Sequence, residues 1–252
     1  MNKIYIVGAG PGSPDLLTVR GMRLLQEADV ILHAGSLVNP VLLQFARPEA
    51  ALFDTAGMVL EEIVKVMIDS VKAGRKVVRL ASGDPSIFGA VREMTEPLIE
   101  AGIDFEIIPG VSSFLAGAAA IKKELTVPDV VQTVILTRCE GRTPMPELEQ
   151  LKELARHQAT LVIFLSVHLS SRVEAGLLEA YPPETPIAIV YRVSWPDEKV
   201  IRGRLDNLHA LVRENKITKT ALIYVGKFLT AEGTRSKLYD ATFTHGYRKA
   251  SS

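Results

Sequence analysis

The chain has 252 residues, with 29 basic and 29 acidic side chains and a formal net charge of zero, which argues against a general nucleic-acid binder. Apolar residues make up 47% and charged residues 23%, the composition of a globular protein, so a largely disordered chain is excluded. The length suits one large α/β domain or two small ones.

Short apolar segments rich in valine and isoleucine alternate with segments of helical periodicity. Consecutive apolar positions of this kind are typical of strands that are covered on both faces. The expected strands are Ile4–Val7, Val30–His33, Val77–Leu80, Phe105–Ile108, Val134–Thr137, Leu161–Leu165, Ile187–Tyr191 and Leu222–Val225. This alternation predicts an α/β protein whose first sheet is mostly parallel.

Two helices are expected from their apolar spacing. Leu60, Ile63, Val64, Met67 and Val71 lie on one helical face, and Gly74 follows as the expected stop. A second helix is expected from Pro146 to His157, with Leu148, Leu151 and Leu154 on one side.

The polar segment at residues 122–131, which contains Pro128, predicts a boundary between two α/β domains of residues 1–125 and 126–252. In the second domain, Ile187–Tyr191 and Lys199–Gly203 are close enough in sequence to form antiparallel neighbours. A mixed second sheet is therefore expected.

The glycine-rich segment Gly8–Ser13 follows the first strand directly. A dinucleotide-binding loop is one interpretation, but the third glycine comes one place too early and Pro11 lacks a backbone N–H. The second strand also ends at His33 and Ala34 with no acidic residue to hold a ribose. A tight turn remains open, and a loop that lines another kind of site is favoured.

Two more segments follow strands at the end where α/β sheets bind ligands. In Ala81–Gly89, Asp84 is either a ligand acceptor or the N-cap of a helix that has Pro85 in its first turn. In Pro109–Ser113, a serine caps the next helix or lines the same site. The sequence leaves both pairs of interpretations open.

The loop Thr137–Pro146 contains Arg138 and Arg142 on either side of Gly141. Two guanidinium groups there could clamp carboxylates, or they could pair with Glu140 at the surface. Cys139 has no motif that supplies a base, so we expect a small buried residue there and not a nucleophile.

Several kinds of site have no signal in the sequence. Cys139 is the single cysteine, so neither a disulfide framework nor a cysteine-based zinc site is expected. The five histidines are far apart, which gives no support to a metal site, and no Walker or Gly-x-Ser-x-Gly motif is present. With no signal peptide and no window of ~18 apolar residues, we expect a cytoplasmic protein without a membrane partner.

Taken together, three motifs resemble those of the tetrapyrrole (corrin/porphyrin) methyltransferases. These are the Gly-x-Gly-Pro-Gly start at Gly8–Thr18, the Gly-Asp-Pro loop at Gly83–Pro85 and the Pro-Gly-x-Ser-Ser turn at Pro109–Ser113. The resemblance extends from Lys3 to about Phe228. It implies two α/β domains in a fold distinct from the Rossmann-like methyltransferases, with S-adenosylmethionine bound in the cleft between the domains.

Two segments, His33–Val38 and Thr137–Pro146, resemble the members of this family that methylate C11 of precorrin-4 or cobalt-precorrin-4 in cobalamin biosynthesis. The uroporphyrinogen methyltransferases carry an aspartate near Ala34, which this chain lacks. The resemblance therefore implies methyl transfer from S-adenosylmethionine to C11 of a carboxylate-rich macrocycle, with S-adenosylhomocysteine as the second product.

The same resemblance assigns residues and partners. Donor-binding positions are Pro11, Ser82, Gly83, Asp84, Ile87, Ser112, Ser113, Leu165, Tyr191 and Ala221. The carboxylates of the implied macrocycle require local cations on a chain of zero net charge, so the candidate substrate-binding residues are Arg138, Arg142 and Arg192, together with Gly10 and Gly12. The implied reaction needs no catalytic side chain and no metal, because alignment of the reactants suffices, and the resemblance implies a homodimer.

Three other functions are weighed against this one. One is an NAD(P)-dependent oxidoreductase that uses the loop at residues 8–13. Another is a tetrapyrrole carrier without catalytic activity. The third is methylation at another position of a corrin precursor, because spacing in the sequence cannot fix which ring carbon is presented.

Overall fold

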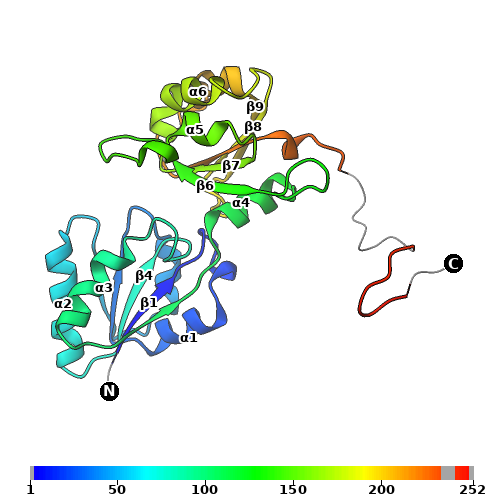
Figure 1. Ribbon diagram of the computed structural model, residues 1–252. Coiled ribbons are helices and arrows are strands. Elements are labelled where there is room, and N and C mark those ends of the chain that lie inside the picture. The colour runs from blue at the N-terminus through cyan, green and yellow to red at the C-terminus, as the bar shows by residue number, and fades with distance from the viewer. Residues whose placement is uncertain (1–2, 234–241, 250–252) are drawn as a thin grey trace. The chain divides into compact units, whose positions relative to one another are not determined.

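The computed structural model describes residues 3–233 and 242–249. The chain divides into two compact units (Figure 1). The first consists of Met1–Ala116 and Arg192–Glu198, and the second of Gly117–Tyr191 and Lys199–Ser252. The boundary expected after residue 125 lies just beyond α4 (Ser113–Ile121), the helix within which the two units divide.

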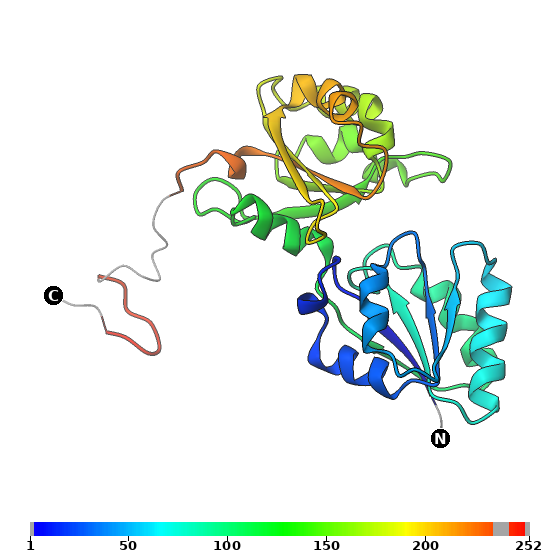
Figure 2. The same cartoon turned by 180° about the vertical axis from the view of Figure 1, so that it is seen from behind.

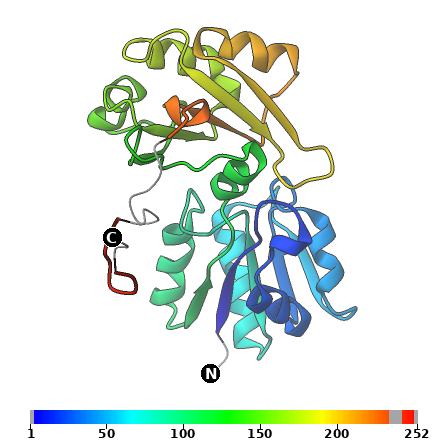
Figure 3. The same ribbon diagram turned by 90° about the vertical axis from the view of Figure 1, so that its right-hand side faces the viewer.

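The first unit contains a five-stranded parallel sheet in the order β3-β2-β4-β1-β5. Figure 3 shows its strands running in one direction, so their carboxyl ends share one edge. The strands are β1 (Ile4–Gly8), β2 (Val30–His33), β3 (Ala51–Asp54), β4 (Val77–Ala81) and β5 (Phe105–Ile108). All but β3 were predicted. β3 escaped notice because it is a short edge strand with alternate exposed residues, among them Leu52 at 48% exposure.

Helices cover both faces of this sheet. α2 (Leu60–Lys72) and α3 (Val91–Glu100) pack on one face through Ile63, Met67 and Leu98. α1 (Val19–Glu27) and the 3-10 helix η2 (Pro40–Phe45) pack on the other. Figure 1 shows α2 and α3 opposite α1 across the sheet. With both faces covered, the loops at the strand ends are the places where this unit can meet a ligand.

The second unit contains a mixed sheet in the order β6-β7-β10-β8-β9, as predicted. β6 (Val134–Arg138) and β7 (Thr160–Phe164) are parallel. β10 (Ala221–Val225) runs antiparallel to β7 and to β8 (Pro186–Tyr191). β9 (Lys199–Arg204) pairs antiparallel with β8, which confirms the expected hairpin.

Helices also cover both faces of the second sheet (Figure 2). α5 (Leu151–Ala155), α6 (Ser170–Leu178) and α7 (Leu208–Glu214) contribute to the apolar core that includes Ile163 and Ile223. Tyr224 points to the opposite face, where α4 crosses it. A Cβ on Gly117 would overlap the Tyr224 ring, so glycine is required for α4 to lie this close.

The prediction of one continuous helix from Pro146 to His157 is wrong. The segment forms the short 3-10 helix η3 (Glu147–Glu149) and then α5, separated by the extended residue Gln150. Leu148 is 81% exposed, so it does not share a buried face with Leu151. Among the residues that the structure describes, no helix combines the length and apolarity needed to span a membrane.

Candidate functional site

The loops after β1, β4 and β5 interlock through their glycine backbones. Gly10 N–H donates to the Gly83 carbonyl at 3.1 Å, and Gly83 N–H donates to the Gly10 carbonyl at 2.9 Å. A Cβ on Gly8 would lie 2.6 Å from Gly110 Cα, and one on Gly110 would overlap the Gly83 carbonyl oxygen. Side chains are excluded at this crossing, so the motif glycines bring the three segments together.

Asp84 ties two of these loops. Its Oδ1 accepts from the Ser86 N–H at 2.8 Å, and its Oδ2 accepts from the Gly110 N–H at 2.9 Å. The alternative in which Asp84 caps a helix is wrong, because α3 begins only at Val91. Gly89 packs against the Pro85 carbonyl with no room for a Cβ, so this segment is a closed turn.

The backbone N–H groups of Ala9 and Gly10 in the first glycine loop are already engaged. Ala9 N–H donates to the Ala81 carbonyl at 2.7 Å, and Gly10 N–H is bonded to Gly83. Pro11 has no N–H to offer. A pyrophosphate needs such donors, so the structure does not favour the dinucleotide-binding interpretation.

The remaining donor positions of the first unit differ in exposure. Ser82 is exposed, and Ile87 and Ser113 are partly exposed, whereas Pro11 and Gly83 are buried. Ser112 is 5% exposed, and its carbonyl accepts the N–H groups of Leu115 and Ala116 at the start of α4. The side chains of Ser82, Ile87 and Ser113 are therefore accessible to a ligand.

The donor positions of the second unit lie at one end of its sheet. Tyr191 ends β8 and is paired directly with Ala221, which begins β10. Leu165 follows β7, the other neighbour of β10. Leu165 has a positive φ of 54° and is 57% exposed. A strained backbone that holds an apolar side chain in solvent is a common feature of ligand sites.

The loop after β6 is held by its own groups. Arg138 Nη2 donates to the Pro144 carbonyl at 2.8 Å and Nη1 donates to the Thr143 carbonyl at 3.2 Å, whereas Arg142 is exposed. Cys139 is 8% exposed, and burial raises the pKa of its thiol. The prediction that Cys139 is a small buried residue is confirmed.

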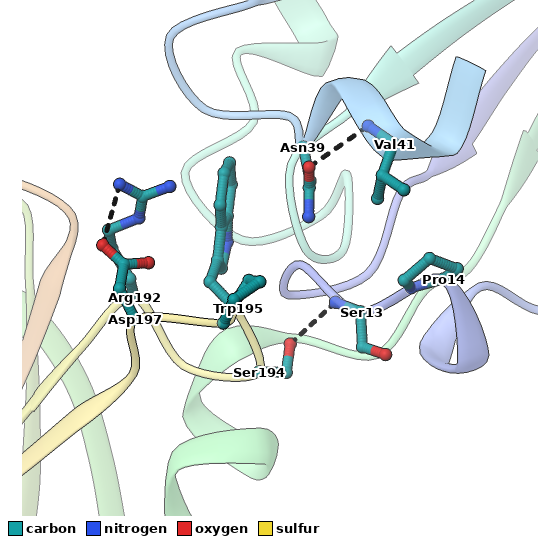
Figure 4. A pocket seen from close by; sticks show the side chains of 9 residues that line it. Ser13, Pro14, Asn39, Val41, Arg192, Ser194, Trp195 and Asp197 are labelled. Atoms are coloured by element: carbon teal, nitrogen blue, oxygen red, sulfur yellow. Dashed lines mark hydrogen bonds and ion pairs between the residues drawn. The ribbon is translucent and has the colours of Figure 1, made fainter. Parts of the chain in front are cut away.

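A cavity of about 620 Å³ opens within the first unit, beside the glycine loop. Its lining comes from three segments that are far apart in sequence (Figure 4): Ser13, Pro14, Asn39, Val41, Arg192, Ser194, Trp195, Pro196 and Asp197. Of these, sequence reasoning had selected Arg192 as a substrate-binding residue and had included Ser13 and Pro14 only as part of the motif segment Gly8–Thr18. The pairing of Arg192 with the single tryptophan three residues later was a signal that could have found the rest.

Hydrogen bonds hold the three segments of this cavity together. The Trp195 indole N–H donates to the Pro11 carbonyl at 3.0 Å, and Ser13 N–H donates to Ser194 Oγ at 2.9 Å. Asn39 Nδ2 donates to the Gly12 carbonyl at 2.9 Å. A Cβ on Gly12 would overlap the indole ring, so Gly12 allows Trp195 to seat against the loop.

A cluster of polar side chains, which sequence reasoning did not recognise as a cluster, lies in the first sheet. Arg79 on β4 is 9% exposed and His33 at the end of β2 is 7% exposed, and burial lowers the pKa of both groups. Hydrogen bonds from the backbone N–H groups of Ala56 and Gly35 lower the pKa of Asp54 at the end of β3. These residues place charge beside the segment His33–Val38.

Within residues 3–233 and 242–249, no group of three or more histidine, cysteine, aspartate or glutamate side chains could hold a metal ion.

The two α/β units and the interlocked glycine loops are those of one protein family. A family model described as tetrapyrrole (corrin/porphyrin) methylases matches residues 3–209. This match covers most of the chain, and the chain belongs to that family.

Particular members are similar over almost the full length. A cobalt-precorrin-4 C(11)-methyltransferase of Methanocaldococcus jannaschii is 53% identical over 250 residues, which are 98% of this chain and 96% of that protein. The X-ray structure of a cobalamin biosynthetic enzyme, cobalt precorrin-4 methyltransferase, superposes with a TM-score of 0.89 and 48% identity. That match covers 91% of this chain and 96% of the solved one.

A more distant solved structure holds a ligand. It is the uroporphyrin-III C-methyl transferase from Thermus thermophilus complexed with S-adenosylhomocysteine. It is 31% identical, with a TM-score of 0.77, and the match covers 90% of this chain and 99% of that one.

Proposed function

We propose that this chain transfers a methyl group from S-adenosylmethionine to C11 of precorrin-4 or of its cobalt-containing form in cobalamin biosynthesis. The observation that carries the proposal is the 53% identity to a cobalt-precorrin-4 C(11)-methyltransferase over 98% of this chain. The uroporphyrin-III C-methyl transferase that holds S-adenosylhomocysteine supports the same donor in this family.

The residues of the donor site fit this donor. Its adenine is a flat apolar ring, and Leu165 presents an apolar side chain to solvent from a strained backbone. The hydroxyl groups of Ser82 and Ser113 are exposed or partly exposed and suit the polar parts of the donor. When bound, the donor supplies a methyl group on a positively charged sulfur, which is electrophilic without further activation.

The chain's own residues then have to align two reactants and exclude water. Gly83 and Asp84 make the hydrogen bonds that join the loops, so in this proposal they hold the loops in position. Ser82, Ile87 and Ser113 touch the donor in the first unit, and Leu165, Tyr191 and Ala221 touch it in the second. An electron-rich ring carbon attacks directly, so no side-chain nucleophile is invoked.

The macrocycle carries acetate and propionate groups, which a chain of zero net charge has to meet with local cations. Arg142 and Arg192 are proposed for this role, together with Gly10 and Gly12 as loop positions that contact the substrate. The Arg138 guanidinium already donates to three backbone carbonyls of its own loop, those of Cys139, Thr143 and Pro144. Its contact with the substrate stays a prediction.

The test is incubation of the enzyme with enzymatically generated precorrin-4 and S-adenosylmethionine labelled with carbon-13 in the methyl group. A single label at C11, read by mass spectrometry and NMR, is the expected result. The cobalt-loaded substrate forms a second arm. Label at another carbon would mean that the enzyme methylates a different ring position. No label in either arm would overturn the proposed substrate.

We also propose that the enzyme is cytoplasmic and works as a homodimer, as the family resemblance implies. Light scattering coupled to size-exclusion chromatography is expected to give twice the mass of the 27.5 kDa chain. A single 27.5 kDa species at micromolar concentration would contradict the dimer.

A further inference from the structure

The cavity beside the glycine loop holds an arginine in a fixed position. The Arg192 guanidinium carbon lies 4.1 Å from the centroid of the Trp195 ring, and Nη1 lies 3.1 Å from Asp197 Oδ2. In the close-up of this cavity (Figure 4), the Trp195 ring lies between Arg192 and Asn39. An arginine held by a cation–π contact and an ion pair has lost much of its rotamer freedom before any ligand arrives.

One face, the N–H group and one edge of the Trp195 ring are already engaged within the protein. The guanidinium covers one side of its ring, its indole N–H is bonded to Pro11, and Gly12 packs against its edge. The ring therefore helps to hold the Arg192 guanidinium in place. A guanidinium has five N–H donors, and the pair with Asp197 engages Nη1, so donors remain for a second carboxylate.

The rest of the lining indicates what carries that carboxylate. Pro14, Val41 and Pro196 are apolar, and the hydroxyl groups of Ser13 and Ser194 lie among them. This mixture suits a carboxylate on a short apolar arm attached to a flat ring. The volume of about 620 Å³ is within the range of small-molecule pockets, about 300–1,000 Å³, and accommodates a substituted pyrrole ring.

We infer that this cavity binds one acetate- or propionate-bearing pyrrole edge of the tetrapyrrole. Arg192 binds the carboxylate, and Trp195 is a positioning residue that, with Asp197, holds the guanidinium in place. The inference rests on the proposed function, because that function supplies the carboxylate-bearing macrocycle. It adds the subsite and the role of Trp195.

The first test uses the fact that Trp195 is the single tryptophan of the chain, so its fluorescence reports on this cavity. The probe is porphobilinogen, a monopyrrole with one acetate and one propionate arm. A saturable change in emission is expected, and Arg192→Ala is expected to weaken the apparent affinity at least tenfold. Arg204→Ala is the matched control, because Arg204 also pairs with an aspartate, Asp206, at 2.7 Å but lies outside the cavity.

The second test separates positioning from a purely structural role. Trp195→Phe keeps an aromatic face but loses the indole N–H, and Trp195→Leu loses both. The KM for the tetrapyrrole is expected to rise from wild type to Phe to Leu, roughly fivefold or more for Leu, as for the loss of a partly desolvated cation–π contact. The affinity for S-adenosylhomocysteine, measured by calorimetry, is expected to stay within twofold.

The outcomes distinguish this inference from the proposed function. If neither precorrin-4 nor its cobalt-containing form is methylated but porphobilinogen binds in an Arg192-dependent way, the carboxylate subsite stands and the proposed function fails. If precorrin-4 is methylated while Arg192→Ala and Trp195→Leu leave its KM unchanged, the subsite is overturned alone. Equal losses of tetrapyrrole and S-adenosylhomocysteine affinity in Trp195→Leu would overturn the positioning role.

Discussion

The Asp84 carboxylate links the loops after β4 and β5 by hydrogen bonds, and we expect ligand binding to depend on that link. Asp84→Ala removes two hydrogen bonds to backbone N–H groups and is expected to lower the free energy of unfolding by about 2 kcal/mol. It is also expected to abolish measurable S-adenosylhomocysteine binding, because the loops after β4 and β5 lose their link. Chemical denaturation and calorimetry measure the two effects.

The control for Asp84 is Asp69→Ala, which removes an exposed ion pair with Lys65 on α2. Its cost is expected to stay below about 0.5 kcal/mol. If Asp84→Ala keeps the stability and the ligand affinity of the wild type, Asp84 does not link the two loops as proposed.

His33 gives a dependence on pH. Burial lowers its pKa in the folded protein, whereas in the unfolded chain it titrates near its ordinary value of 6.5. The unfolded chain therefore binds the proton more tightly, and stability is lost as the pH falls below about 6.5 towards the folded pKa. In His33→Gln the loss of stability between pH 7.5 and 5.5 is expected to be smaller than in wild type, as measured by urea denaturation at each pH. Parallel losses in the two proteins would contradict this prediction.

At the scale of elements, the crossing of the loops after β1, β4 and β5 requires glycine at positions where a Cβ would overlap a neighbouring backbone. In Gly110→Ala the new Cβ meets the Gly83 backbone, which cannot rotate away, so the free energy of unfolding is expected to fall by about 2 kcal/mol or more. Gly57→Ala is the matched control, since nothing lies within 4 Å of a Cβ there. Thermal unfolding of both variants checks the comparison, and equal midpoints would show that the crossing tolerates a side chain.

The same scale shows where local sequence patterns suffice. The strand Val30–His33, buried at all four positions, was predicted to the residue, because a continuous apolar run has few alternative readings. β3 was missed because its alternate residues are exposed and its apolar pattern is weak. A helix start at Asp84 and Pro85 was one expectation, because these residue types are common at the first turn of a helix. In the structure, the Asp84 carboxylate accepts a hydrogen bond from the distant Gly110 N–H, and the segment forms a turn.

At the scale of the whole chain, the candidate site depends on contacts that no local pattern encodes. Ser13 and Ser194 are 181 residues apart and bond directly. The motif resemblance selected the glycine loop and Arg192, but it did not select Trp195 or Asn39, because the pocket exists only once residues 192–198 pack in the first unit. Sequence therefore predicted the sheets and the motif loops, and folding assembled the pocket.

This long-range packing can be removed without disturbing the strands that flank it. Tyr191 at the end of β8 and Lys199 at the start of β9 are directly paired, so a two-residue Asn-Gly turn can replace residues 192–198 while keeping the hairpin register. The variant is expected to keep the second sheet, read by hydrogen exchange of β8, β9 and β10. It is expected to lose porphobilinogen binding measured by calorimetry, because Arg192 and the other lining residues of the loop are gone. Retained binding would mean that the carboxylate subsite is built elsewhere, and early exchange of β8 would mean that the loop also stabilises the hairpin.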